Sequence, residues 1–430
     1  LHSFPTRRSS DLMVVGTDQF RVLILGFVSI LIVTIGYTPI LQSSYYSLFA
    51  VVGAIAVVIA NLGSKCFRNN FALIANVLFY IAICYLYKII NVSTASWGAI
   101  LQHSLFFFPV LLMPLLTDSL SRVHKKWLIL IILAIVIVNV MDNIRICIAN
   151  PELLLMVNRD FVTEEMEGIG NVGGAKWYNS LCFFFMSCFF CYLNSFCKYI
   201  RYIMLLASIF SGVFIVVFCL KASVIVFAVF SAISIYFGKK TRYFSKFIIL
   251  GGVSSIFMFV LIFMFADFIT DFLSSTMEKR VVSRLLLFVS SDSVEAESGS
   301  NTMGARAGLW LVSIETWLSN PVSFIFGIGD HRALYSVAKT GIGNHSDFFD
   351  TLGRYGLIGS LLIINIFRLS FRYILFLYEK SSKLQVKVIF LVFILFGFTK
   401  GVFTPGIGCM LFLMLSQMSI FFIKDTSYTS

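Results

Sequence analysis

The chain has 430 residues, of which 59% are hydrophobic and only 13% are charged, and its mean hydropathy is +0.92. Soluble domains carry about 25% charged residues, so this composition excludes an ordinary soluble protein. The formal net charge of +12 comes from Lys and Arg scattered over short connections, which indicates loops that orient a membrane protein and excludes a nucleic-acid-binding stripe.

The first residues differ in character from the rest of the chain. Residues 1–12, LHSFPTRRSSDL, precede Met13 and begin with Leu. They resemble translated sequencing-adapter sequence and lack the apolar segment of a signal peptide, so we expect them to be foreign to the fold. Residues 13–430 are then expected to form a single polytopic membrane domain.

Apolar runs long enough to cross about 30 Å of hydrocarbon recur along the chain. They predict an all-α integral membrane protein with about twelve transmembrane helices. The predicted spans are 22–40, 45–62, 71–90, 98–117, 127–144, 179–196, 202–219, 222–238, 246–267, 351–369, 386–400 and 406–423.

The connections between these spans predict their orientation. Lys and Arg gather in alternate connections, so we expect those connections, and both termini, to be cytoplasmic. Two of the other connections, 145–178 and 268–350, are long. Loops of more than about 15 residues are usually functional or disordered. We therefore expect a large outer, periplasmic loop between the ninth and tenth spans, at 268–350, to carry the functional residues.

Basic residues also occur inside the predicted spans, where ionisable groups are costly and usually functional. Those in the outer third of their spans include Lys88, Arg145, Lys221 and Lys400. Snorkelling of a long side chain to the interface explains any one of them. Their shared depth predicts a polar cavity that opens to the outer side.

The stretch GNHSDFFDTLGRYGLIG, residues 343–359, has the pattern of a helix start. Asn344 is predicted as the N-cap, with Asp347 at the third helical position and His345 in the first turn, where free N–H groups favour an anion. Asp350 and Arg354 are spaced for an i, i+4 pair. Gly356 and Gly359 predict a small-x-x-small face that packs on a neighbouring helix. On spacing alone, a solvated loop histidine and simple helix packing remain the alternatives.

The order of residues in the outer loop resembles the motif of the O-antigen ligase and polymerase (Wzy-type) superfamily. The matching positions are Arg306, Trp310, Asn320, Pro321, Gly327, Gly329, His345, Ser346, Gly356 and Gly359. The resemblance covers residues 305–360, and the topology of about twelve spans extends it over most of the chain. One departure occurs at Lys221, where many relatives have a Ser-Arg pair.

The resemblance implies a GT-C-type membrane glycosyltransferase that acts at the outer leaflet on an undecaprenyl-diphosphate-linked oligosaccharide, without a metal or other cofactor. It implies His345 as the base and Arg306 as the catalytic cation. Arginine suits a diphosphate leaving group because it is always charged and bidentate toward phosphate oxygens. The basic residues expected to bind diphosphate or glycan are Arg280, Arg284, Lys221, Arg145, Lys88, Lys400 and Arg354.

Several functions remain open at this point. The polymerase branch transfers glycan to the next lipid-linked repeat unit, the ligase branch to lipid A-core, and a third branch to a protein hydroxyl. Polymerisation is preferred over the third branch because the chain ends shortly after its last span. A lipid-linked glycan transporter and a non-catalytic assembly partner are the non-enzyme alternatives, although no internal repeat supports the transporter. Expected partners are membrane lipid and chain-length-regulator and flippase proteins.

Overall fold

The computed structural model describes residues 9–38, 44–90, 92–93, 97–149, 175–218, 222–240, 303–330, 341–343, 346–399 and 401–422. The elements in these ranges are helices, and no β-strand occurs among them. The predicted all-α fold class is therefore confirmed for this part of the chain.

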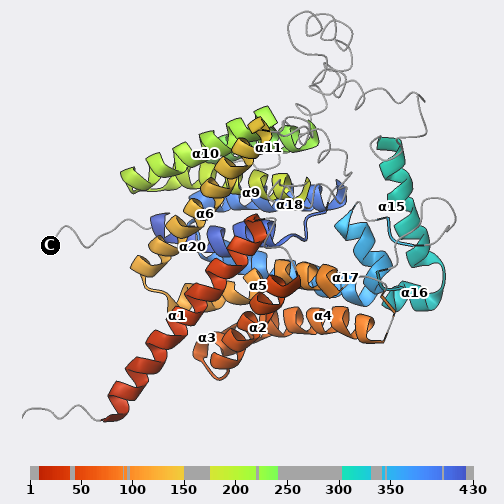
Figure 1. Cartoon of the computed structure of the whole chain (residues 1–430), viewed down its shortest axis with the longest axis horizontal. Coiled ribbons are helices and arrows are strands. Elements are labelled where there is room, and N and C mark those ends of the chain that lie inside the picture. The colour runs from red at the N-terminus through yellow and green to blue at the C-terminus, as the bar shows by residue number, and fades with distance from the viewer. Residues whose placement is uncertain are drawn as a thin grey trace, which may run out of the picture.

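The helices follow one another in three groups along the chain (Figure 1). The first group is α1 (Ser9–Tyr37), α2 (Ser44–Ala60), α3 (Lys65–Asn69), α4 (Phe71–Ile89), α5 (Trp97–Ser119) and α6 (Arg122–Ala149). The second is α9 (Ala175–Asn194), α10 (Lys198–Phe218) and α11 (Ala222–Lys240). The third is α15 (Met303–Leu318), α16 (Pro321–Phe326), α17 (Asp347–Phe376), α18 (Lys380–Thr399), α19 (Pro405–Gly408), η2 (Cys409–Met414), α20 (Leu415–Met418) and η3 (Ser419–Phe422).

Many of these helices have the length and composition of membrane spans. Within the described ranges, 7 segments qualify: Phe71–Ile89, Trp97–Ser119, Arg122–Ile146, Lys198–Ile215, Asp347–Phe376, Lys380–Thr399 and Pro405–Phe422. Helices α1, α2, α9 and α11 occupy four more of the predicted span ranges. The remaining range, 246–267, lies outside the described residues. The chain is thus a multi-helix protein of the membrane-embedded type.

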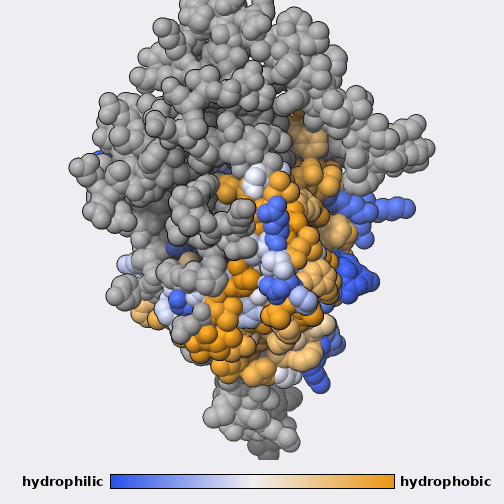
Figure 2. Space-filling view, turned by 90° about the vertical axis from the view of Figure 1, so that its right-hand side faces the viewer, coloured by the Kyte–Doolittle hydropathy of each residue, from blue (hydrophilic) through white to orange (hydrophobic). Residues whose placement is uncertain are grey.

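Two helices, α15 and α16, lie at one end of the bundle (Figure 1). They pack beside the beginning of α17 and near the end of α4, where the Tyr87 hydroxyl donates to the carbonyl oxygen of Phe326. A view onto this end shows hydrophilic residues between apolar ones (Figure 2). This end of the bundle therefore brings together segments that are far apart in the sequence.

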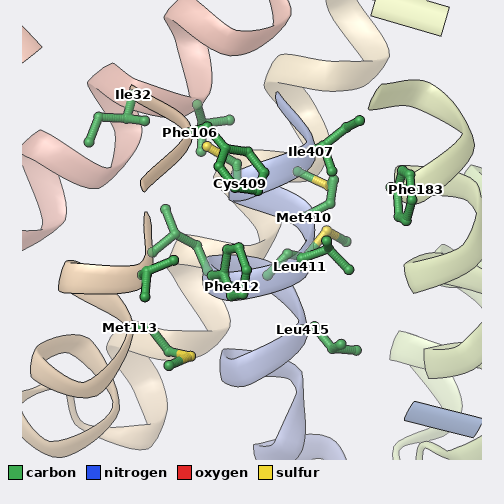
Figure 3. Close-up of a cluster of buried hydrophobic side chains, with 14 of the residues drawn as sticks. Ile32, Phe106, Met113, Phe183, Ile407, Cys409, Met410, Leu411, Phe412 and Leu415 are labelled. Carbon is green, nitrogen blue, oxygen red and sulfur yellow. The ribbon is translucent and has the colours of Figure 1, made fainter. Parts of the chain in front are cut away.

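The C-terminal helical segment, Pro405–Phe422, forms the centre of the bundle, and 94% of its span window is buried. A helix that is apolar on all sides belongs in the interior. The Phe412 ring lies 5.9 Å from that of Phe106 in α5. Ile32 of α1 and Phe183 of α9 belong to the same cluster of buried side chains around this segment, with Met410 and Leu411 on the side that faces Phe183 (Figure 3). The π-helical turn η2 lies in this core.

Small residues allow this central segment to approach its neighbours closely. A Cβ atom added to Gly408 would lie 2.5 Å from the carbonyl oxygen of Phe106, and one added to Gly36 would lie 2.8 Å from the backbone nitrogen of Gly406. In a membrane, helices associate through such close packing, because lipid tails are as apolar as the side chains they would replace. The core thus fixes α1 and α5 against the central segment.

Candidate functional site

Helix α17 is broken near its start by a kink at Gly356. The φ of 60° and ψ of −158° at this residue are essentially restricted to glycine. At the kink, the carbonyl oxygens of Gly353 and Arg354 accept hydrogen bonds from the backbone N–H groups of Ile328 and Gly329, each at 2.9 Å. The turn after α16 therefore satisfies backbone groups of a helix that is interrupted at this point.

The two glycine motifs of the sequence meet at this kink. A Cβ added to Gly327 would lie 2.4 Å from the backbone of Arg354, and one added to Gly356 would lie 2.5 Å from the backbone of Ile325. Gly327 and Gly329 also have positive φ values of 76° and 74°. Because no side chain fits between the two backbones, Gly327 of the G-x-G motif and Gly356 of the G-x-x-G motif form one interlock between α16 and α17.

The predicted small-x-x-small face is correct for one glycine and wrong for the other. Gly356 approaches a neighbouring element, as expected. Gly359 does not, because the kink brings it against its own helix: a Cβ there would lie 2.2 Å from Cβ of Tyr355. The prediction assumed an unbroken helix, in which both glycines would share one face.

Arg354 forms an ion pair with Asp330, with 3.0 Å between Nε and Oδ1. The two side chains are only 12% and 21% exposed. The backbone N–H of Asp330 in turn donates to the Ser93 hydroxyl at 3.3 Å. The predicted pair of Arg354 with Asp350 is present only as an electrostatic attraction at longer range, because the Gly327–Gly329 turn places Asp330 beside the guanidinium and Asp350 makes its hydrogen bonds to other groups.

Asp350 is 1% exposed and holds the chain on both sides of residues 344 and 345. Its Oδ1 accepts from the Ser313 hydroxyl at 2.7 Å, and its Oδ2 accepts from the backbone N–H of Ser346 at 3.3 Å. The Ser313 hydroxyl itself accepts from the backbone N–H of Gly343 at 3.0 Å. This chain of hydrogen bonds, here called the Ser313–Asp350 bracket, fixes the residues that flank the predicted base.

The N-cap of α17 is Ser346, and the prediction of Asn344 is wrong. The Ser346 hydroxyl accepts from the backbone N–H of Phe349 at 3.3 Å and donates to the carbonyl oxygen of Gly397 in α18 at 2.9 Å. Asp347 is consequently the first helical residue and not the third. Serine suits this position because its hydroxyl can accept the capping hydrogen bond of α17 and at the same time donate a hydrogen bond to α18.

Helix α15 carries Arg306 and Trp310, and its backbone lies close to the segment that precedes His345. A Cβ added to Gly343 would lie 2.3 Å from the carbonyl oxygen of Leu309, which is one helical turn from Arg306. The Trp310 ring lies 6.0 Å from that of Phe349. The structure thus brings the helix that carries Arg306 beside Gly343 and the start of α17, the two described segments that flank position 345 in the sequence.

Some of the remaining predicted positions lie in the described part of the chain, and the others lie outside it. Pro321 begins α16, whose N-cap Asn320 accepts from the backbone N–H of Ser323 at 2.8 Å. Lys88 is half-buried with Nζ 6.0 Å from the ring centroid of Trp97, and Arg145 is exposed. The residues Lys221, Arg280, Arg284, His345 and Lys400, and the side chain of Arg306, lie outside the described part of the chain. The predicted outer cavity therefore stays a prediction.

Two polar residues of α15 that hold this unit together were not among the predicted site residues. Ser313 belongs to the bracket, and Thr316 exchanges two hydrogen bonds with the backbone of Gly341, at 2.9 and 2.7 Å. Both side chains are buried. The signal that would have found them is the spacing of two small hydroxyl residues at i and i+3 on one helix face.

No protein-family model matches this chain, and no curated protein matches it. In the described ranges, no group of three or more His, Cys, Asp or Glu residues is placed to hold a metal ion. A function must therefore be inferred from the motif residues and from the geometry of the unit that they form.

We expect Gly356→Ala to destabilise the protein more than Gly63→Ala. Both glycines have positive φ, of 60° and 84°, but only Gly356 has backbone atoms within 3 Å of an added Cβ. The control therefore measures backbone strain alone, about 1–3 kcal/mol, whereas Gly356→Ala also separates α16 from α17. Thermal unfolding of the detergent-solubilised protein measures the difference, and equal losses of Tm would contradict the interlock.

We expect Ser313→Ala to destabilise the protein by about 1–3 kcal/mol, because it removes the hydrogen-bond partner of the buried Asp350 Oδ1 and of the Gly343 N–H. Ser370→Ala is the matched control, since that buried hydroxyl donates only to Ile366 of its own helix. Limited proteolysis between α16 and α17 reports the loosening of this segment. A cleavage rate in Ser313→Ala equal to that in the control would refute the bracket.

Proposed function

We propose that this chain is a GT-C-type membrane glycosyltransferase of the O-antigen ligase and polymerase superfamily. Its reaction would be polymerisation of undecaprenyl-diphosphate-linked oligosaccharide repeat units, of the O-antigen, capsule or exopolysaccharide type. The observation that carries the proposal is the convergence of motif residues. The described motif positions between Trp310 and Gly356 belong to one packed unit, in which Gly327 lies against α17, Gly356 lies against α16 and Gly343 lies on α15.

The proposed reaction transfers a growing glycan from its lipid diphosphate to a hydroxyl of the next lipid-linked unit. The hydroxyl oxygen forms a bond to the anomeric carbon, and the bond from that carbon to the diphosphate oxygen breaks. Negative charge develops on the departing diphosphate. Preorganised cations at such a position usually supply the largest catalytic contribution, and Arg306 is the candidate cation.

The acceptor hydroxyl loses its proton in this reaction, and His345 is the candidate base. Histidine is the side chain whose ordinary pKa lies nearest neutrality. A base must be held in a defined position to be effective. The Ser313–Asp350 bracket supports this role, because it fixes Gly343 and Ser346 on either side of the histidine position.

We further propose a topology of about twelve spans, GT-C-like, with both termini in the cytoplasm and the 268–350 loop outside. The arrangement of basic residues supports this orientation. Helix α4 ends beside α16, so the exposed Arg68, which precedes α4, lies at the opposite end of the bundle. Lys380, after the end of α17, lies at that opposite end as well.

We expect His345→Ala and Arg306→Ala each to abolish long glycan chains while the protein still accumulates in the membrane. Loss of a general base typically costs about 10²–10⁴-fold in rate. Loss of one preorganised donor costs about 2.7–4 kcal/mol. Arg306→Lys should stay impaired, because lysine keeps the charge and loses the planar fork. Gel analysis of glycan chain length, with membrane blotting of the protein, provides the measurement.

Two exposed residues at the other end of the bundle serve as controls for these variants. His124→Ala and Arg372→Ala remove the same side-chain types there and should leave chain length unchanged. Wild-type polymerisation by His345→Ala would refute the assignment of the base. If glycan were transferred only when lipid A-core is supplied as the acceptor, the protein would belong to the ligase branch instead.

We expect a reporter that is active only outside the cytoplasm to be active when fused near Gly299 and silent when fused near Lys240. The basic connection at Lys239 and Lys240 should be retained inside by the positive-inside rule. The reverse pattern of reporter activity would invert the topology and with it the proposed outer location of the site.

A further inference from the structure

Asp347, predicted only as a capping acid, connects α17 to the linker between the last two candidate spans. Its Oδ2 accepts hydrogen bonds from the backbone N–H groups of Val402 and of Phe403, the latter at 2.6 Å. These two donors lie 55 and 56 positions further along the chain. A single carboxylate oxygen thus joins the first turn of α17 to residues 401–404.

The linker 401–404 is non-helical and yet lies in the interior: Val402 is fully buried and Thr404 is 6% exposed. Buried backbone groups outside a helix need partners from other segments. Asn179 donates to the carbonyl oxygen of Gly401 at 3.2 Å, and the hydroxyls of Ser180 and Thr404 are hydrogen-bonded at 3.1 Å. Asp347 is the partner of the two N–H groups between these contacts.

The contact lies close in the sequence to two residues of the proposed active site. Asp347 lies two residues after His345, and the linker begins one residue after Lys400. The neighbouring Ser346 also bonds to Gly397, near the end of α18. The turn that closely follows the proposed base in the sequence and the linker that follows a proposed diphosphate-binding lysine are therefore attached to each other directly.

We propose that Asp347 is a positioning residue that holds the 401–404 linker against the first turn of α17. The role deepens the proposed glycosyltransferase function and rests on it, since in the sequence the linker directly follows the proposed substrate-binding Lys400 and the turn closely follows the proposed base His345. Two backbone N–H groups already occupy Oδ2. The carboxylate therefore acts as an acceptor for the linker and orients groups that belong to other residues.

The acceptor geometry separates this role from a catalytic one. Both hydrogen bonds go to one oxygen, so Asp347→Asn can keep them through its amide oxygen while it removes the negative charge. Asp347→Ala removes the acceptor altogether. A positioning residue should therefore tolerate asparagine and not alanine, whereas a residue that acts through its charge should tolerate neither.

The test measures amide hydrogen exchange at residues 400–404 in the full-length protein, together with glycan chain length in cells. We expect Asp347→Ala to raise the exchange rate of the Val402 and Phe403 amides about tenfold or more, because both lose their acceptor. Asp347→Asn should exchange like the wild type and keep most of its chain length. Asp118→Ala is the control: it removes an exposed acid in the last turn of α5, far along the chain from the linker, and it should change neither measurement.

Two results would overturn the proposal. Unchanged exchange in Asp347→Ala would show that the carboxylate does not hold the linker. Wild-type exchange in an Asp347→Asn protein that makes no long glycan would assign the residue to charge stabilisation instead of positioning. Failure of the wild type itself to polymerise would reject the proposed function, while the exchange measurement would still decide whether Asp347 holds the linker.

Discussion

The contact between the backbones of Gly327 and Gly356 is the constraint on which this end of the molecule depends. It is possible only without side chains, because a Cβ on either residue would lie within 2.6 Å of the other segment. The contact sets the kink in α17 and delivers Asp330 to Arg354 at 3.0 Å. The first turns of α17 consequently have a fixed direction, toward α15 and away from the axis of the span that follows.

Acidic side chains at this junction serve chiefly as acceptors for backbone N–H groups. Asp350 accepts from Ser346, and Asp347 accepts from Val402 and Phe403. The N–H groups of loop segments in a membrane-type bundle lack water as an alternative partner, so an unpaired one is costly. Short carboxylates at a helix start suit this purpose, because they also interact favourably with the helix dipole.

The sequence predicted the helix positions well and the contacts between them poorly. Apolar runs identify helices such as α4 and α18 because hydrophobic length is a local property. The glycine motifs were recognised from the resemblance, and the structure gives the physical reason for Gly327 and Gly356, where a Cβ would meet the backbone of the other segment. The Arg354–Asp330 pair was missed because its two residues lie 24 positions apart. The N-cap was placed two residues early, although Ser346 is capped locally through Phe349, because Asn344 and Ser346 are both good capping residues and the bond to Gly397 in α18 is not visible in the sequence. The catalytic roles of His345 and Arg306 remain predictions from the motif.

The kink also resolves how α17 can be a candidate span and yet carry three ionisable residues in its first turns. The 20 residues from Leu357 to Phe376 are by themselves long enough to cross about 30 Å of hydrocarbon. Asp347, Asp350 and Arg354 all precede Gly356, so they need not enter the hydrocarbon. The break separates these three charged residues from the longer part of the helix, whose own charged residues, Arg368 and Arg372, lie toward its C-terminal end. The same residue that locks the junction therefore sets Asp347, Asp350 and Arg354 apart from the candidate span.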